Sequence, residues 1–273
     1  MLKTKQHNRR GKVFLVGAGP GDPDLITIKA LRCLRQANVV LYDRLINRQL
    51  LSYAAEAKLI YTGKRAGADS IGQRHIEQLL IDHALDGKIV VRLKGGDPFI
   101  FGRGGEEAQA LKRAGVPYEI VPGITSAIAA PAYGGIPVTH RGCASSAAIV
   151  TGHDVGRVNW RLLLAAVDTI IILMGLKNLP QIMSRLMEGG CDPNKPVALI
   201  QSGTNISQEK LDGTVSTIAS FAQRWQFHGA TVIVFGEVVR LGKDLEWFQQ
   251  ANRSQPLPVW TRRNRIAASN CGN

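Results

Sequence analysis

Stretches of β-branched and aliphatic residues alternate with helical patterns along almost the whole chain, from residue 12 to about residue 245. The apolar runs predict strands over residues 12–17, 38–42, 58–62, 88–93, 117–121, 147–151, 169–174, 196–201 and 230–235. Apolar residues at helical spacing predict helices over residues 28–37, 70–85, 105–114, 178–188 and 215–226. This alternation is typical of an α/β fold, in which mostly parallel sheets are covered by helices.

The segment 122–136 divides this pattern, because it is rich in proline, glycine and other small residues. Its small residues predict a tightly packed connecting helix. We therefore expect two α/β domains, over residues 12–121 and 137–248, with a cleft between them. The sequence leaves open how many strands the second domain has and whether some run antiparallel. Residues 209–218 have the pattern of a hairpin-like strand followed by a helix.

The formal net charge of +13 is concentrated at the two ends of the chain. Residues 1–12 hold five lysines and arginines, residues 250–273 hold four, and neither segment has an acidic residue. We expect two basic, disordered tails, at residues 1–11 and 249–273. The body between them is only mildly basic, so a nucleic-acid partner is not required, although local basic pockets would suit an acidic ligand.

The composition indicates a folded protein without a metal centre. Hydrophobic residues make up 45% of the chain and charged residues 20%, which is ordinary for a globular protein. The apolar runs are too short to cross a bilayer, and no signal-peptide segment follows the basic start, so we expect a cytoplasmic protein. The cysteines have no metal or disulfide spacing and are expected to be free thiols. They are Cys33, Cys143, Cys191 and Cys271.

The first predicted strand ends in a glycine-rich loop, GAGPGD at residues 17–22. Two of its glycines match the dinucleotide fingerprint G-x-G-x-x-G, but Asp22 stands where the third glycine belongs. Pro20 has no N–H to offer a phosphate, and Asp22 would repel one. A turn capped by Asp22 or Asp24 and a direct contact with a ligand both remain open.

A second glycine loop, GGDPFIFGRGGEE at residues 95–107, follows the fourth predicted strand and lacks the Lys-Ser/Thr of a phosphate-binding P-loop. Its paired glycines let the backbone approach a ligand closely. Asp97 could hold a hydroxyl or a cation, and Ile100 and Phe101 supply an apolar wall. The two loops suit a ligand with a flat part, ribose hydroxyls and positive charge but no phosphates. S-adenosylmethionine has these properties.

Longer motifs then follow one another along residues 12–248. They are VFLVGAGPGDPDLITIKAL, VVLYDRLI, YTGKRAG, VVRLKGGDPFIFGRGGEEAQAL, VPYEIVPGITSAIAAPAYGGIPVTHR, VTGHD, ILMGLKNLPQI and PVALIQSGT. In these motifs the chain resembles the tetrapyrrole methylase family, and specifically its members that methylate uroporphyrinogen III. The resemblance implies methyl transfer from S-adenosylmethionine to C-2 and C-7 of uroporphyrinogen III, which gives precorrin-2 for siroheme or cobalamin. It also implies a two-domain fold and a homodimer, with no metal and no fused further module.

The resemblance also implies roles for individual residues. Asp43 of YDR is implied as the proton acceptor and Lys64 of GKR as the proton donor. The residues implied to line the methyl-donor site are Pro20, Gly95, Gly96, Asp97, Ile100, Thr125, Ser126, Met174 and Gly203. From the residues alone, a helix cap or an ion pair with Arg44 is the simpler role for Asp43, and Lys64 has the pattern of an exposed turn lysine.

The substrate that the resemblance implies is a polycarboxylate, which gives the basic residues near the motifs a use. The planar fork of arginine suits carboxylate recognition. The candidate substrate-binding residues are Arg44, Arg65, Arg103, His140 and Arg141. Each arginine could instead form a surface salt bridge, and His140 could simply pack.

Some positions depart from the family pattern and leave alternatives open. Gly142-Cys143 stand where an acid and then an aromatic residue or histidine are usual, and Ala68-Asp69 stand where a basic residue and a histidine are usual. These differences affect the expected fit of the substrate loops. One alternative is a family member with another substrate: a different corrinoid carbon, a diphthine precursor or ribosomal RNA. A second is a nucleic-acid-binding protein that uses its basic tails, and a third is a catalytically idle relative.

Overall fold

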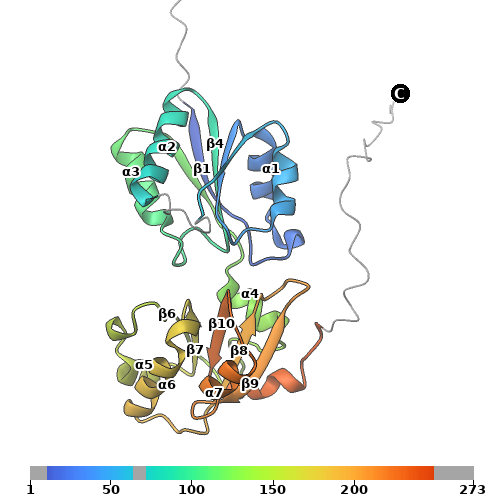
Figure 1. Ribbon diagram of the computed structural model, residues 1–273, viewed down its shortest axis with the longest axis vertical. Helices are drawn as coiled ribbons and strands as arrows, with labels where there is room; N and C mark the ends of the chain where they lie inside the picture. The colour runs from blue at the N-terminus through green and yellow to red at the C-terminus, as the bar shows by residue number, and fades with distance from the viewer. Residues whose placement is uncertain (1–10, 64–71, 249–273) are drawn as a thin grey trace, which may run out of the picture.

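The computed structural model describes residues 11–63 and 72–248 (Figure 1). The two candidate residues Lys64 and Arg65 lie outside the described residues, as do almost all of the two predicted tails. Within the described residues, no helix is long and apolar enough to cross a membrane.

The first sheet is entirely parallel, with the strand order β3-β2-β4-β1-β5. Its strands are β1 (Lys12–Gly17), β2 (Val39–Tyr42), β3 (Lys58–Tyr61), β4 (Ile89–Lys94) and β5 (Tyr118–Val121). Its helices are α1 (Ile28–Gln36), α2 (Gln73–Leu85) and α3 (Gly104–Arg113). All these elements lie within a few residues of their predicted positions, because each has a clear apolar period and a turn at each end.

Alternate residues of each strand give the first sheet its two buried faces. Phe14 and Val16 of β1 pack against α1, while Val13 and Leu15 pack against α2 and α3. Figure 1 shows α1 on one side of the sheet and α2 and α3 on the other. A parallel sheet covered on both faces brings the carboxyl ends of all its strands to one edge.

The second sheet has the strand order β6-β7-β10-β8-β9 and is mixed. Only β6 and β7 pair in parallel, and the other three pairs are antiparallel. The prediction of mostly parallel sheets is therefore wrong for this half. The cause is the short connection 202–208, which folds β9 back along β8 as a hairpin and leaves no room for a crossover helix. The strands are β6 (Ala147–Thr151), β7 (Thr169–Leu173), β8 (Pro196–Gln201), β9 (Glu209–Thr214) and β10 (Thr231–Phe235).

Helices also cover both faces of the second sheet (Figure 1). One face packs against α5 (Trp160–Ala166), α6 (Leu179–Glu188) and α7 (Ile218–Arg224). The other packs against α4 (Ser126–Tyr133) and a short 3-10 helix, η5 (Glu237–Lys243). The other 3-10 helices of the described residues are η1 (Pro23–Leu25), η2 (Arg48–Ala54), η3 (Val155–Arg157) and η4 (Leu176–Asn178). The seven-residue α5 was not predicted, because its sequence, WRLLLAA, is apolar at nearly every position and shows no helical period.

Helix α4 connects the two halves and lies between them (Figure 1). Ala127 and Ala130 are buried against Ile171 and Val232 of the second sheet. The tightly packed connecting helix is thus confirmed, and it belongs by its contacts to the second half. The fold as a whole is the expected one of two α/β domains, while the residue at which one domain ends and the next begins stays a prediction.

Candidate functional site

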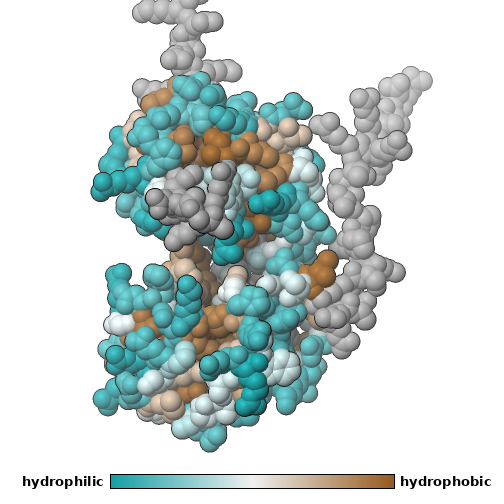
Figure 2. Space-filling model, viewed as in Figure 1, coloured by the Kyte–Doolittle hydropathy of each residue, from teal (hydrophilic) through white to brown (hydrophobic). Residues whose placement is uncertain are grey.

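The carboxyl edge of the first sheet faces the carboxyl ends of β6, β7 and β8. Two hydrogen bonds join the edges: the Asp22 N–H donates to Thr204 Oγ1 at 3.0 Å, and the Tyr133 hydroxyl donates to Asp22 Oδ2 at 3.2 Å. Asp22 lies in the loop after β1, and Thr204 lies in the loop after β8. Figure 2 shows the surface hollowed between the two domains. Loops at carboxyl ends are where open α/β sheets bind ligands, so this cleft is the candidate site.

Three glycines let the loops after β1, β4 and β5 touch backbone to backbone. Gly19 and Gly96 exchange two hydrogen bonds, Gly19 N–H to Gly96 O at 3.3 Å and Gly96 N–H to Gly19 O at 2.7 Å. A Cβ on Gly17 would lie 2.5 Å from Gly123 N, and one on Gly123 would lie 2.3 Å from Gly96 O. Gly17, Gly96 and Gly123 thus form a close junction, in which Gly17 and Gly123 leave no room for a side chain.

Gly96 also presents an open face toward the start of α4. Its φ is +66°, and a Cβ there would meet nothing closer than Ser126 N and Thr125 Cα at 3.8 Å. The residues in the loops after β4 and β5 that were predicted to line the methyl-donor site therefore lie together. Pro20 stands in the neighbouring loop, and Ile100 has 37% of its surface exposed. Backbone amides and carbonyls, hydroxyls and an apolar side chain are the groups that an uncharged nucleoside needs.

The aspartates of the two glycine loops are already bonded to the protein. Asp22 Oδ1 accepts from the Asp24 N–H at 2.9 Å, so the capped turn is confirmed. Asp97 Oδ1 accepts from the Phe99 N–H at 2.8 Å, and its Oδ2 accepts from the Gly123 N–H at 3.0 Å. Each carboxylate oxygen has a second acceptor site. Asp97 can therefore hold its loops together and still accept a hydrogen bond from a ligand hydroxyl.

The second sheet contributes loops with an unusual backbone. Met174, Ser202 and Thr204 have φ values of 57°, 51° and 71°, in the left-handed region that non-glycine residues rarely adopt. Gly203 packs so closely on α4 that a Cβ would lie 2.4 Å from the Cβ of Ala130. Since β10 separates β7 from β8, Met174 and Gly203 follow strands that lie roughly 10 Å apart. Such strain concentrates at ligand-binding loops.

Asp43 follows β2 and is fixed by two groups on neighbouring strands. Its Oδ1 accepts from Arg92 Nη2 at 2.6 Å and from Thr62 Oγ1 at 3.0 Å. Asp43 thus neither caps a helix nor pairs with Arg44. A Cβ on Gly95 would lie 3.3 Å from the Cβ of Leu45, so the loop that carries Asp43 touches the GGDP loop.

Behind Asp43 lies a buried charge cluster, formed by Arg92, Lys94 and Glu107, which the sequence analysis missed. Glu107 Oε1 accepts from Arg92 Nε at 3.0 Å and from Lys94 Nζ at 2.9 Å. The three residues are 2%, 3% and 0% exposed. A signal was present: residues 92 and 94 are cations on one face of a strand that is otherwise apolar.

The environment shifts the pKa values of both cations in the charge cluster. Burial lowers the pKa of Lys94, and the neighbouring charge of Arg92 lowers it further. Burial alone would also lower the pKa of Arg92, but the carboxylates of Glu107 and Asp43 outweigh it and raise that pKa. Arg92 is therefore a permanent cation next to Asp43.

The predicted substrate residues differ in their environment. Arg44 and Arg141 are exposed and form no ion pair within residues 11–63 and 72–248. Arg103 pairs with Glu106 at 3.2 Å and begins α3 from a left-handed conformation, with φ +59°. His140 Nδ1 accepts from the Gly142 N–H at 3.1 Å, which leaves its Nε2 as the donor when the ring is neutral.

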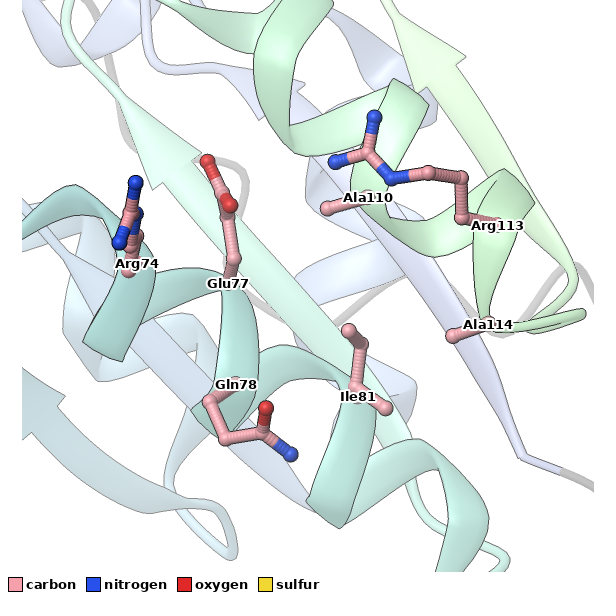
Figure 3. A pocket seen from close by; sticks show the side chains of 7 residues that line it. All are labelled: Arg74, Glu77, Gln78, Ile81, Ala110, Arg113 and Ala114. Carbon is pink, nitrogen blue, oxygen red and sulfur yellow. The ribbon is translucent and has the colours of Figure 1, made fainter.

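A second hollow lies on the outer face of the first domain, between α2 and α3 (Figure 3). Its residues are Arg74, Glu77, Gln78, Ile81, Ala110, Arg113 and Ala114. Figure 3 shows the two arginines, the glutamate and the glutamine around an open, polar groove. None of the predicted site residues lines it. Among the residues that the structure describes, no three His, Cys, Asp or Glu side chains come together as metal ligands.

Comparison with known proteins decides the family. The model of the tetrapyrrole (corrin/porphyrin) methylases matches residues 12–219. The chain belongs to the tetrapyrrole methylase family. Among curated relatives, the uroporphyrinogen-III C-methyltransferase of Bacillus subtilis is 49% identical over 252 residues, which cover 90% of this chain and 98% of the relative. The siroheme synthase of Pseudomonas entomophila is 46% identical, but the chain spans only 54% of its length.

Solved structures of tetrapyrrole methylases have the same fold. The uroporphyrin-III C-methyltransferase of Thermus thermophilus is 42% identical, with a TM-score of 0.76 over 86% of this chain and 99% of that chain. A further structure of the Thermus thermophilus enzyme, complexed with S-adenosylhomocysteine, is 39% identical, with a TM-score of 0.73 over 85% of this chain and 100% of that chain. The resemblance expected from the motifs is therefore confirmed across nearly all of the described chain.

Proposed function

We propose that this chain methylates uroporphyrinogen III at C-2 and C-7, with S-adenosylmethionine as the methyl donor, and so forms precorrin-2 for siroheme or cobalamin synthesis. The observation that carries the proposal is the meeting of a glycine junction and a fixed carboxylate at one edge of the cleft. The glycine loops after β1, β4 and β5 meet at Gly96, and a fixed carboxylate, Asp43, lies in the adjoining loop. The curated relatives of similar length have this activity in their names.

The residues present fit the donor, and we propose that it lies against the glycine junction. Gly95 and Gly96 would approach it with backbone, Asp97, Thr125 and Ser126 would offer acceptors and hydroxyls, and Ile100 and Met174 would provide apolar contact. Pro20 and Gly203 would close the two sides. When bound, S-adenosylmethionine supplies an electrophilic methyl group on a sulfonium. The protein's main task is then to align a nucleophilic ring carbon with that methyl group.

Asp43 would carry out the proton chemistry. A pyrrole carbon that gains a methyl group leaves positive charge on the ring system, and a carboxylate beside the ring stabilises that charge and accepts the released proton. Asp43 suits this task because Arg92 and Thr62 hold it at the rim of the cleft, where its side chain is 30% exposed. Lys64 remains the candidate proton donor on the basis of its motif.

The two arginines that form no ion pair in the described part of the chain would bind the carboxylates of the substrate. Arg44 and Arg141 are exposed and belong to loops that the resemblance places at the substrate, and Arg103 and His140 belong to the same set. Arg65 is included by its motif. Guanidinium groups without an ion partner can bind carboxylates without first breaking another pair.

The test is incubation of purified protein with S-adenosylmethionine and uroporphyrinogen III, followed by mass spectrometry of the tetrapyrrole. We expect a product with two added methyl groups. A tetrapyrrole mass that stays unchanged, while a competent control enzyme methylates the same substrate, would contradict the proposal.

We also propose that the enzyme is cytoplasmic and, as the family resemblance implies, a homodimer. Light scattering coupled to size exclusion should give twice the mass of the chain. A mass of one chain at assay concentrations would refute the dimer without affecting the proposed reaction.

A further inference from the structure

The guanidinium of Arg92 connects three elements at the carboxyl edge of the first sheet. Nη2 donates to Asp43 Oδ1 at 2.6 Å, Nη1 donates to Thr62 Oγ1 at 3.2 Å, and Nε donates to Glu107 Oε1 at 3.0 Å. These partners follow β2, follow β3 and lie on α3. Every nitrogen of the fork thus has a partner, so the side chain has one geometry.

We propose that Arg92 is a positioning residue that fixes the carboxylate of Asp43 for methyl transfer, an inference that rests on the function proposed above. Thr62 cannot do this alone. Its hydroxyl lies 3.0 Å from both Asp43 Oδ1 and the carbonyl oxygen of Tyr42, and it has only one hydrogen to donate. Arg92 therefore donates a hydrogen bond to Asp43 whichever of its two acceptors the Thr62 hydroxyl binds.

The charge balance of the cluster supports this role. Glu107 Oε1 is shared between Arg92 and Lys94, while Glu107 Oε2 has no hydrogen-bond partner in the described part of the chain. One carboxylate therefore faces two cations, and a net positive charge remains for Asp43. Because Arg92 is only 2% exposed, solvent screens its attraction for Asp43 less than it would screen a surface pair. An arrangement that served stability alone would not need a second cation behind the first.

The first test is the variant R92K, which keeps the charge but loses the fork. We expect kcat to fall about 10- to 100-fold, the size that misplacement of a reacting group by about an ångström produces, with unchanged affinity for S-adenosylhomocysteine. R185K is the matched control, because Arg185 pairs with Glu188 at 3.0 Å on the surface of the second domain. R185K should leave kcat unchanged.

Two further measurements separate positioning from a structural role. In the D43N background, R92K should cause no additional loss of kcat, whereas a structural role predicts that the two losses multiply. In a crystal structure of R92K, the Asp43 side chain should occupy more than one rotamer. If R92K does not fold, T62V serves instead, with a smaller loss of kcat and a less ordered Asp43.

Two outcomes overturn the positioning role. One is full additivity of R92K and D43N, and the other is a single, unchanged Asp43 rotamer in R92K. Failure of the proposed function is a different result, because wild-type protein would then form no methylated product. The Asp43 rotamer in R92K would still decide whether Arg92 positions it.

Discussion

The two edges that face each other across the cleft are built differently. The first sheet places charges there: Asp43, Arg92, Lys94 and Glu107 lie within one hydrogen-bonded cluster. The second sheet contributes backbone there, with left-handed residues in the loops after β7 and β8, a feature that the loop after β4 shares at Phe101 and Arg103. A group that handles protons must be fixed by other charges, whereas a surface that fits a nucleoside needs shape. The first edge therefore carries the proposed proton chemistry, and the loops of the second edge complete the fit of the donor.

The largest expected effect on stability comes from the buried charges. E107Q removes the carboxylate that Arg92 and Lys94 share and leaves buried positive charge without its partner. We expect the free energy of unfolding to fall by about 3–5 kcal/mol, measured by urea denaturation.

The matched control is E106Q, which breaks only the exposed pair with Arg103 and should change the unfolding free energy by less than about 1 kcal/mol. Similar small losses for E107Q and E106Q would show that the cluster is not the rigid support that the comparison assigns to the first edge.

A smaller effect is expected at the second edge, where shape matters. G203A would place a Cβ 2.4 Å from the Cβ of Ala130, so the loop 202–205 must move away from α4. We expect a loss of about 1–3 kcal/mol in unfolding free energy, together with weaker binding of S-adenosylhomocysteine. G105A is the control, since nothing lies within 4 Å of a Cβ there. Unchanged ligand affinity in G203A would remove Gly203 from the donor site.

The smallest effect on stability is expected at a solvated cluster of ion pairs, which lies at the opposite end of the first sheet from the buried charge cluster. Glu119 accepts hydrogen bonds from Lys12 and Lys29, which lower its pKa from 4.5 to about 2. Because the folded pKa lies below the unfolded one, the ionised pair stabilises the protein above about pH 4.5, and this contribution is lost as the pH falls toward 2.

E119Q should therefore lower Tm only slightly at neutral pH, which corresponds to a loss of less than about 1 kcal/mol in unfolding free energy. The loss is small because solvent screens the pair. The difference in Tm between E119Q and wild type should shrink near pH 3. A difference that stays constant across this range would rule out the lowered pKa as its cause.

Sequence alone predicts the first domain well and the second less well. Each parallel strand of the first sheet ends in a distinct turn, so the positions of its strands and helices along the chain follow from the local sequence pattern. The direction of β10 depends instead on the hairpin between β8 and β9, which is a tertiary choice. Local pattern does not determine such pairings.

The candidate site shows the same limit. Asp43 could be singled out by its motif, but its partner could not, since Arg92 is 49 residues away and meets it only through strand pairing. Asp22 illustrates the converse, because its cap on Asp24 is local and was among the expected alternatives. Its bond to Tyr133 joins distant segments and had no local signal. Burial, and then the neighbouring carboxylate of Asp22, raise the pKa of the Tyr133 hydroxyl to about 12.

The central claim is that the two edges have separate tasks, and calorimetric titration of S-adenosylhomocysteine tests it directly. D43N should bind the ligand as tightly as wild-type protein while losing methyl transfer, because Asp43 is proposed to act on the tetrapyrrole and not on the donor. G203A should bind it more weakly. Loss of affinity in D43N equal to that in G203A would contradict this division between the edges.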